Sequence, residues 1–225
     1  MAFHLATSWK ERGLQLQGLK DKCNSIIGTL DLPDDDARLQ ALVQVRQLCN
    51  TLAAVSIKLQ QNSEIGSNVP VIMALLGIQE VSDLKSVLGD LNQNAKLSFV
   101  TMCQFSLENC VYRILASLSG RSNSARFSEE SERLIRLAGL DRPADKHQLI
   151  LVPAWIRNTL HSGGIHKRSS KTVVVDAEPY RFVEGERLEC GTWSHLFHAV
   201  LHALDVYAEI LASSPVIAIR RVELS

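Results

Sequence analysis

The sequence predicts a mainly helical protein: a helical bundle with a small β-hairpin inserted near residues 172–190 and a helical extension at the N-terminus. Several long segments carry apolar residues at spacings of three and four, which is the pattern of one helix face. Only short runs between residues 172 and 183 are rich in β-branched and aromatic residues. Hydrophobic residues make up 46% and charged residues 21% of the chain, which is typical of a packed globule rather than a disordered chain.

We expect two parts, a helical segment over residues 1–65 that packs on the core and a larger helical domain over 66–225. The boundary falls in the loop 62–70, which is rich in Asn, Ser, Gly and Pro. In the N-terminal part, apolar residues repeat with helical spacing over 5–30 and again over 39–61. A helical hairpin is therefore the expected form of this part.

The larger part contains further helical segments, each bounded by residues that start or stop helices. Ser or Asp at the first turn accepts bonds from free N–H groups, whereas Gly and Pro end or kink a helix. The expected segments are one or two short helices over 71–91 broken at Gly77 and Gly89, a long helix over 95–118 stopped by Gly120, a helix from the N-cap Ser128 to Gly139, a helix from Asp145 to His161 that kinks or begins at Pro153, and a helix over 192–212.

Two short runs, Thr172–Val175 and Tyr180–Val183, have the composition of strands. A turn around Ala177–Pro179 separates them, so they predict a hairpin. The apolar tail Val216–Ile219 is expected to dock on the core or on a partner.

Charge and cysteine content limit the partners and the compartment. Lys plus Arg and Asp plus Glu both number 24, so any contact with nucleic acid must be small and local. The five cysteines form no C-x-x-C pair, and Cys103 and Cys110 lie in an apolar helical pattern, so a reducing, cytoplasmic location and a core position are expected. No signal peptide follows Met1 and no apolar run reaches the about 20 residues of a membrane span, so we expect no membrane association.

The most function-like segment is Arg157-Asn158-Thr159-Leu160-His161, followed by Gly163-Gly164. Arg157 and His161 are four positions apart, which places them on one helix face, one turn apart. Histidine can move a proton near neutral pH, and the donor fork of arginine suits a phosphate. With a ribose 2′-hydroxyl as the nucleophile, these two groups suffice for metal-free cleavage of RNA but not of DNA. The same spacing is also compatible with a solvated helix end that has no function.

Neighbouring residues extend this candidate site. Lys167, Arg168 and Lys171 follow the glycine turn and form a local positive patch that suits a small RNA footprint. His166 in the same loop is either a substitute base or a merely exposed residue. Glu108, inside an apolar helix, is either a surface acid or a buried carboxylate that needs a partner, for which Arg157 is the candidate.

A second set of polar residues lies on the last helix. His195, His198 and His202 are spaced at i, i+3 and i+7, and Asp205 and Glu209 continue the stripe. Imidazoles one turn apart can share a metal ion. The chain has no H-E-x-x-H motif and no cysteine near this stripe, which lies opposite the apolar face, so we interpret it as a polar outer face or a dimer contact. No metal site and no cofactor are expected.

The remaining motifs exclude other classes. The acidic run Asp34–Asp36 is more simply a helix start than a metal cluster. No G-x-x-x-x-G-K-[ST], no G-x-G-x-x-G after a strand and no G-x-S-x-G occurs. P-loop nucleotide hydrolysis, Rossmann oxidoreduction and α/β-hydrolase chemistry are therefore not expected.

The segment Ile156–Gly164 resembles the R-N-x-[LI]-H-x-x-G variant of the signature of HEPN domains, a family of small helical bundles. The surroundings are also similar to that family: a long helix with Glu108 on its edge, the Arg-His helix, a short hairpin and a long closing helix, together covering roughly residues 95–212. Three residues separate Arg157 and His161, whereas the family usually has four to six.

The resemblance implies a metal-independent endoribonuclease of bacterial toxin–antitoxin or phage-defence systems. It implies Arg157 and His161 as catalytic residues, Asn158 as a supporting residue and Glu108 as a partner. It further implies a homodimer in which two Arg-His pairs meet in one cleft, with RNA as the substrate and an antitoxin or regulatory protein as a possible partner. Because the family also contains non-catalytic members, the alternative is a protein-interaction or RNA-binding module.

Overall fold

Helices dominate the computed structural model, which describes residues 3, 5–6, 8–63, 69–120 and 126–223. The mainly helical prediction and the single small hairpin are confirmed. In chain order the elements are α1 (Trp9–Ile27), α2 (Ala37–Ser63), α3 (Val69–Leu76), α4 (Val81–Ser119), α5 (Phe127–Leu137), α6 (Pro143–His161), β1 (Lys171–Val175), β2 (Glu178–Phe182), α7 (Trp193–Leu211) and α8 (Ser214–Ile217).

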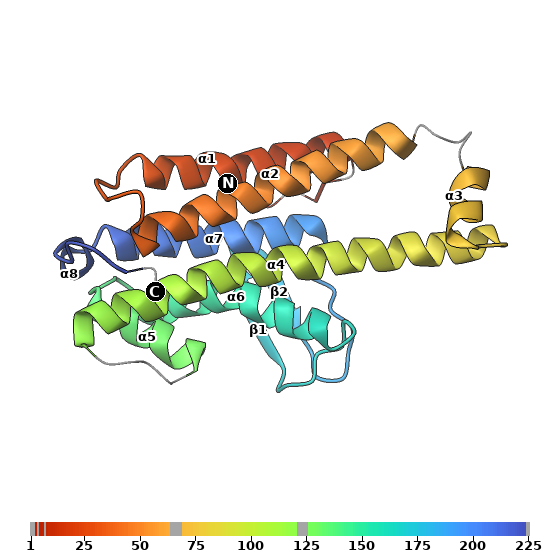
Figure 1. Cartoon of the computed structure of the whole chain (residues 1–225). Coiled ribbons are helices and arrows are strands. Elements are labelled where there is room, and N and C mark those ends of the chain that lie inside the picture. Colours follow the sequence, from red (N-terminus) through yellow and green to blue (C-terminus); the bar gives the residue numbers. More distant parts are fainter. Residues whose placement is uncertain (1–2, 4, 7, 64–68, 121–125, 224–225) are drawn as a thin grey trace.

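Helix α7 lies at the centre of the bundle and is buried along most of its surface. The pair α1 and α2 packs on one side of α7 and α4, while α6 packs on the other side with α5 and the hairpin (Figure 1). One continuous hydrophobic core joins these layers, with Leu42 from α2, Ile114 from α4 and Leu204 from α7 among its fully buried members. The apolar stripes that predicted the helices are the faces that meet in this core.

The N-terminal half of α4 projects from the bundle and carries α3 at its outer end (Figure 1). The prediction that Gly89 breaks a helix is wrong, because α4 runs through it without interruption. A glycine inside a helix costs only about 1 kcal/mol, which the rest of a long helix outweighs. Gly77 follows the end of α3 with a φ of 65°, and Gly120 ends α4 in the left-handed conformation, as predicted.

Besides α4, which begins at Val81 instead of near residue 95, two helix starts differ from the prediction. Helix α5 begins at Phe127 with Arg126 in the N-cap position, so Ser128 lies in the first turn instead of capping it. Helix α6 begins at Pro143, whose ring fits the first turn because the N–H group there has no helical partner. Pro153 neither begins nor ends α6. The loss of one hydrogen bond at this buried proline is outweighed by the apolar residues that α6 buries around it.

Strands β1 and β2 form the predicted antiparallel hairpin. Its turn is Asp176–Ala177, earlier than the predicted Ala177–Pro179, and both residues have positive φ values of 50° and 69°. Positive φ at both positions matches the right-handed twist of the two strands and gives a tight two-residue connection. Tyr180 and Phe182 of β2 are buried against the bundle.

The C-terminal tail docks on the core, which was one of the two predicted outcomes. Val216 and Val222 are fully buried. The residues that hold the tail come from the start of α2: the Arg38 guanidinium donates to the carbonyl of Val216, and the Asp36 carboxylate accepts from the N–H of Val222. Asp36 thus precedes a helix as predicted, yet it is also a fully buried anchor for the end of the chain.

All five cysteines are buried as free thiols, and the predicted core positions of Cys103 and Cys110 are confirmed. Burial raises the pKa of the Cys110 thiol to about 12. Among the described helices, none combines the length and the apolar character that a membrane crossing requires.

Candidate functional site

The last turn of α6 and the loop behind it form a fixed frame for the candidate site. Gly163 and Gly164 have φ values of 70° and 81°, which turn the chain sharply away from the helix. The loop is then tied to a distant segment: the N–H of His166 donates to the carbonyl of Glu186, and the N–H of Leu188 donates to the carbonyl of Gly164, both at 2.9 Å. The residues after the glycines are therefore held beside the helix end.

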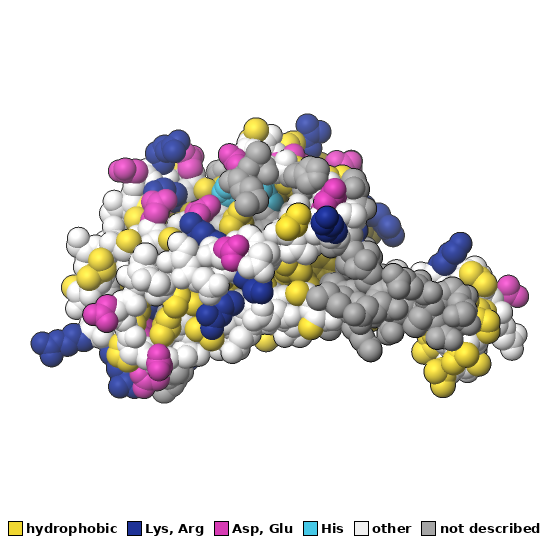
Figure 2. Space-filling view, turned by 90° about the horizontal axis from the view of Figure 1, so that it is seen from above, with side chains coloured by type: hydrophobic (Ala, Val, Ile, Leu, Met, Phe, Trp, Pro, Cys, Tyr) yellow, Lys and Arg dark blue, Asp and Glu magenta, His cyan; other side chains and the backbone are white. Residues whose placement is uncertain are grey.

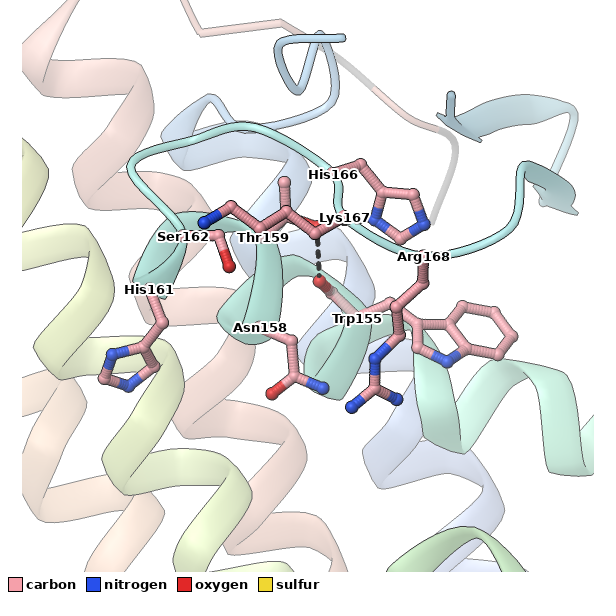
Figure 3. A pocket seen from close by; sticks show the side chains of 8 residues that line it. All are labelled: Trp155, Asn158, Thr159, His161, Ser162, His166, Lys167 and Arg168. Carbon is pink, nitrogen blue, oxygen red and sulfur yellow. Dashed lines mark hydrogen bonds between the residues drawn. The ribbon is translucent and has the colours of Figure 1, made fainter. Parts of the chain in front are cut away.

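A pocket of about 270 Å³ lies between this helix end and the loop. Figure 3 shows its lining, in which the Asn158 amide lies between the His161 ring and the Arg168 guanidinium in that view. His161, Lys167 and Arg168 are exposed, and Asn158 is half-buried. The lining residues are Trp155, Asn158, Thr159, His161, Ser162, His166, Lys167 and Arg168. An imidazole and two cationic side chains thus share one open pocket.

Arg157 is not one of the lining residues. Its guanidinium lies 3.6 Å from the Glu108 carboxylate of α4, and it donates to the Asn158 side-chain oxygen at 3.1 and 3.2 Å. Of the two alternatives for Glu108, the structure shows the one in which Arg157 is its partner, with both side chains about one-quarter exposed. Tyr112 donates to the same carboxylate at 3.0 Å, and burial followed by the Glu108 charge raises the pKa of this phenol to about 12.

The interpretation of His166 as a merely exposed loop residue is wrong, because the side chain is only 4% exposed. The Thr159 hydroxyl donates its single proton to the carbonyl of Trp155, so its oxygen accepts from the Nδ1 of His166 at 3.0 Å. The His166 ring also packs on Phe182 of the hairpin. His166 therefore fastens the loop to α6 and to the hairpin, which leaves His161 as the solvent-accessible imidazole of the pocket.

The predicted basic patch is divided by the fold. Lys167 and Arg168 line the pocket, whereas the Lys171 ammonium lies over the Trp155 ring, 4.3 Å from its centroid. Burial, and then the charge of Arg168, lowers the pKa of Lys171. Trp155 was not a sequence candidate although it lines the pocket. An aromatic residue among basic ones is typical of surfaces on which bases stack, and this signal was present in the sequence.

The three histidines of α7 do not lie on the polar outer face that the sequence predicts. His198 is only 7% exposed, and Tyr180 of the hairpin covers it. The helical pattern placed these residues opposite the apolar stripe, but Tyr180 of the hairpin packs on that side of α7 at His198. His195 and His202 are half-buried there, and Glu209 is exposed.

A double-mutant cycle tests the link between α4 and α6. Because both groups are partly exposed, solvent screens their attraction, so Arg157→Met, Glu108→Gln and the double variant are expected to show a coupling of about 0.5–1 kcal/mol. Urea unfolding of the four proteins measures it. A coupling indistinguishable from zero would show that the two side chains do not interact in solution.

Comparison with models of protein families, with curated proteins and with solved structures found no match.

Proposed function

We propose that the protein is a metal-independent endoribonuclease of the HEPN type. The observation that carries the proposal is the pocket at the end of α6, where an exposed imidazole, His161, stands with the cations Lys167 and Arg168. An RNA phosphate needs positive charge for binding, and its cleavage needs a group that transfers a proton. The pocket supplies both.

The reaction requires no added water. The imidazole of His161 accepts the proton of the ribose 2′-hydroxyl, and the 2′-oxygen forms a bond to phosphorus. The bond between phosphorus and the 5′-oxygen breaks, and that oxygen takes up a proton, so the products are a 2′,3′-cyclic phosphate and a 5′-hydroxyl. Lys167 and Arg168 stabilise the negative charge that grows on the phosphoryl oxygens. In the homodimer that the resemblance implies, a second copy of the imidazole supplies the proton for the leaving oxygen.

Arg157 receives a different role from the one the sequence suggested. Its guanidinium is engaged by Glu108 and by the oxygen of the Asn158 amide. With the oxygen held in this way, the NH₂ group of Asn158 is the part of the amide that can donate to a phosphate in the pocket. We therefore assign Arg157 as a positioning residue that orients Asn158 and adds positive charge beside the pocket.

The half-buried Trp155 gives the pocket a surface for a nucleobase. Stacking on an aromatic ring tolerates every base and stabilises a bound single strand by about 1–3 kcal/mol per base. Such a site suits a short, single-stranded segment of RNA, which agrees with the zero net charge of the chain. Action in the cytoplasm, in a toxin–antitoxin or phage-defence system with an antitoxin or regulatory protein, is the setting that the resemblance implies.

The test is an RNA cleavage assay with the purified chain, with and without excess EDTA. We expect cleavage of a single-stranded RNA oligonucleotide in both conditions and a 2′,3′-cyclic phosphate on the upstream product, detected by mass spectrometry. An otherwise identical oligonucleotide with a 2′-deoxyribose at the cleaved position should remain intact there. Cleavage that continues at the deoxy position, or that stops with EDTA, would contradict the proposed route.

A second candidate function is a non-catalytic interaction module. It is favoured by the projecting arm, by which we mean α3 and the N-terminal half of α4. The outer part of the arm exposes apolar side chains of α3 and of the start of α4, including Leu75, which is 81% exposed. Figure 2 shows hydrophobic side chains gathered at this projecting end. In this case RNA would stay intact with every variant, while Leu75→Glu would abolish self-association in light scattering. If the protein is instead a nuclease whose arm forms the dimer contact, Leu75→Glu would abolish RNA cleavage and self-association together.

A further inference from the structure

The turn of the β-hairpin meets α7 at a cluster of three potential metal ligands. Asp176 lies in the turn, and His198 and His202 lie one helical turn apart on α7. One ligand atom of each residue lies within 4.8 Å of the other two. The Nε2 atoms of the two imidazoles are 3.1 Å apart. Two nitrogen ligands about 2.0–2.1 Å from a tetrahedral Zn²⁺ ion are separated by about 3.3 Å, so this spacing is that of a ligand pair.

Hydrogen bonds outside the cluster set the tautomer of His198. The Tyr180 hydroxyl donates its one proton to the carbonyl of His195 at 3.0 Å. Its oxygen lies 2.9 Å from the Nδ1 of His198 and therefore accepts a hydrogen bond from that nitrogen. The proton of a neutral His198 ring is thus on Nδ1, and the lone pair of Nε2 faces His202 and Asp176. A metal-binding histidine is usually held in this way, by a bond from its other ring nitrogen.

His202 has a similar support. Its Nδ1 lies 3.5 Å from the Asp205 carboxylate, which can hold a proton on that nitrogen while Nε2 binds an ion.

We propose that Asp176, His198 and His202 form a binding site for a divalent transition-metal ion of the Zn²⁺ class. The donor set of two imidazoles and one carboxylate suits a borderline cation better than Ca²⁺ or Mg²⁺, which prefer oxygen ligands. The ion ties the hairpin turn to the central helix. None of its ligands lines the pocket beside α6, so the site has a structural role that is independent of RNA cleavage.

The surroundings fit an ion that is shielded from solvent on one side. The Phe3 ring packs against His198, with the ring centroids 5.3 Å apart, and covers that imidazole. The fully buried Tyr180 lies behind the site and stacks on the same ring at 6.0 Å. Asp176, the third ligand, is exposed.

Calorimetric titration of the full-length, EDTA-treated and desalted chain with ZnCl₂ tests the site. We expect one ion per chain for the wild type and affinities at least tenfold lower for Asp176→Asn and for His202→Gln. Asparagine tolerates the left-handed conformation of the turn, so Asp176→Asn removes the carboxylate charge with little strain. Tyr180→Phe keeps the packing but frees Nδ1 of His198, and a roughly 10–100-fold loss of affinity is expected.

His147→Gln is the matched control, because His147 is a half-buried histidine of α6 outside the cluster, and it should leave the affinity for Zn²⁺ unchanged. Co²⁺ in place of Zn²⁺ should give visible absorption bands without a cobalt–thiolate charge-transfer band. Unchanged Zn²⁺ affinity in both ligand variants, or a thiolate band, would overturn the proposal. Circular dichroism of each variant confirms that it is folded before titration. The RNA cleavage rate should not depend on Zn²⁺, so failure of this site and failure of the nuclease proposal are separate results.

Discussion

Replacement of His161 by Ala is expected to lower the rate of RNA cleavage by about 10²–10⁴-fold, the usual contribution of a proton-transferring side chain. The side chain is exposed at the end of α6, so its removal should leave the melting temperature within about 1 °C of the wild-type value. Single-turnover cleavage of a labelled RNA measures the rate, and differential scanning calorimetry measures the melting temperature.

His147→Ala is the control for this experiment, because it removes a histidine from the same helix outside the pocket. Its cleavage rate should equal that of the wild type. Cleavage by His161→Ala at the wild-type rate would end the assignment of His161 as the proton carrier. A rate loss that is matched by a loss of folded protein would point to a structural role instead.

The replacement of Asp36 by Ala is expected to have the largest effect on stability, lowering the free energy of unfolding by about 3–5 kcal/mol. Asp36 and Arg38 are 0% and 2% exposed and lie 2.7 Å apart. Without the carboxylate, the Arg38 guanidinium stays buried without its counter-charge, and the N–H of Val222 loses its acceptor. Urea unfolding followed by circular dichroism measures the loss.

Asp35→Ala is the matched control, because this neighbouring carboxylate is about half exposed and pairs with Arg221 at the surface. Exposed ion pairs contribute about 0–1 kcal/mol, so its effect should be small. Equal losses for the two variants would contradict the special role of the buried pair.

The pH dependence of stability provides a separate check on Asp36. Burial alone would raise the pKa of this carboxyl, but the hydrogen bonds from Arg38 and Val222 and the Arg38 charge together lower it. A lowered pKa in the folded state means that the stabilisation is complete above the unfolded value of about 3.9 and is lost as the pH falls through the folded value. The difference in stability between wild type and Asp36→Ala should therefore be constant from pH 8 to 5 and shrink below about pH 4.

Local signals predicted much of the fold because they act within a few residues. The apolar spacing of three and four identified the long helices, and Gly120 ends α4 because only a residue that tolerates positive φ closes that helix end. Gly89 is also a glycine, but unlike Gly120 it lies inside the long helix α4, where the neighbouring turns maintain the helix. A single glycine therefore does not determine whether a helix ends.

The candidate site was predicted in part. The segment from Asn158 to Arg168 does line a pocket, since the helix end and the glycine turn are local features. The sequence named Arg157 as the candidate partner of Glu108, and the two side chains do meet. The spacing of Arg157 to His161 did not show that Arg157 lies outside the pocket lining, because its direction is set by Glu108 and Asn158. The burial of His166 likewise depends on contact with Phe182 of the hairpin.

The sequence by itself determined the helical class, the hairpin, the burial of Cys103 and Cys110 and the segment that carries the proposed chemistry, since periodicity, turn residues and side-chain type are properties of neighbouring residues. Only the tertiary structure decided which charges meet. It placed Arg157 on Glu108, Asp36 under the C-terminal tail, and Asp176 beside His198 and His202. These contacts join distant parts of the chain, and their formation depends on how the helices and the hairpin pack around α7.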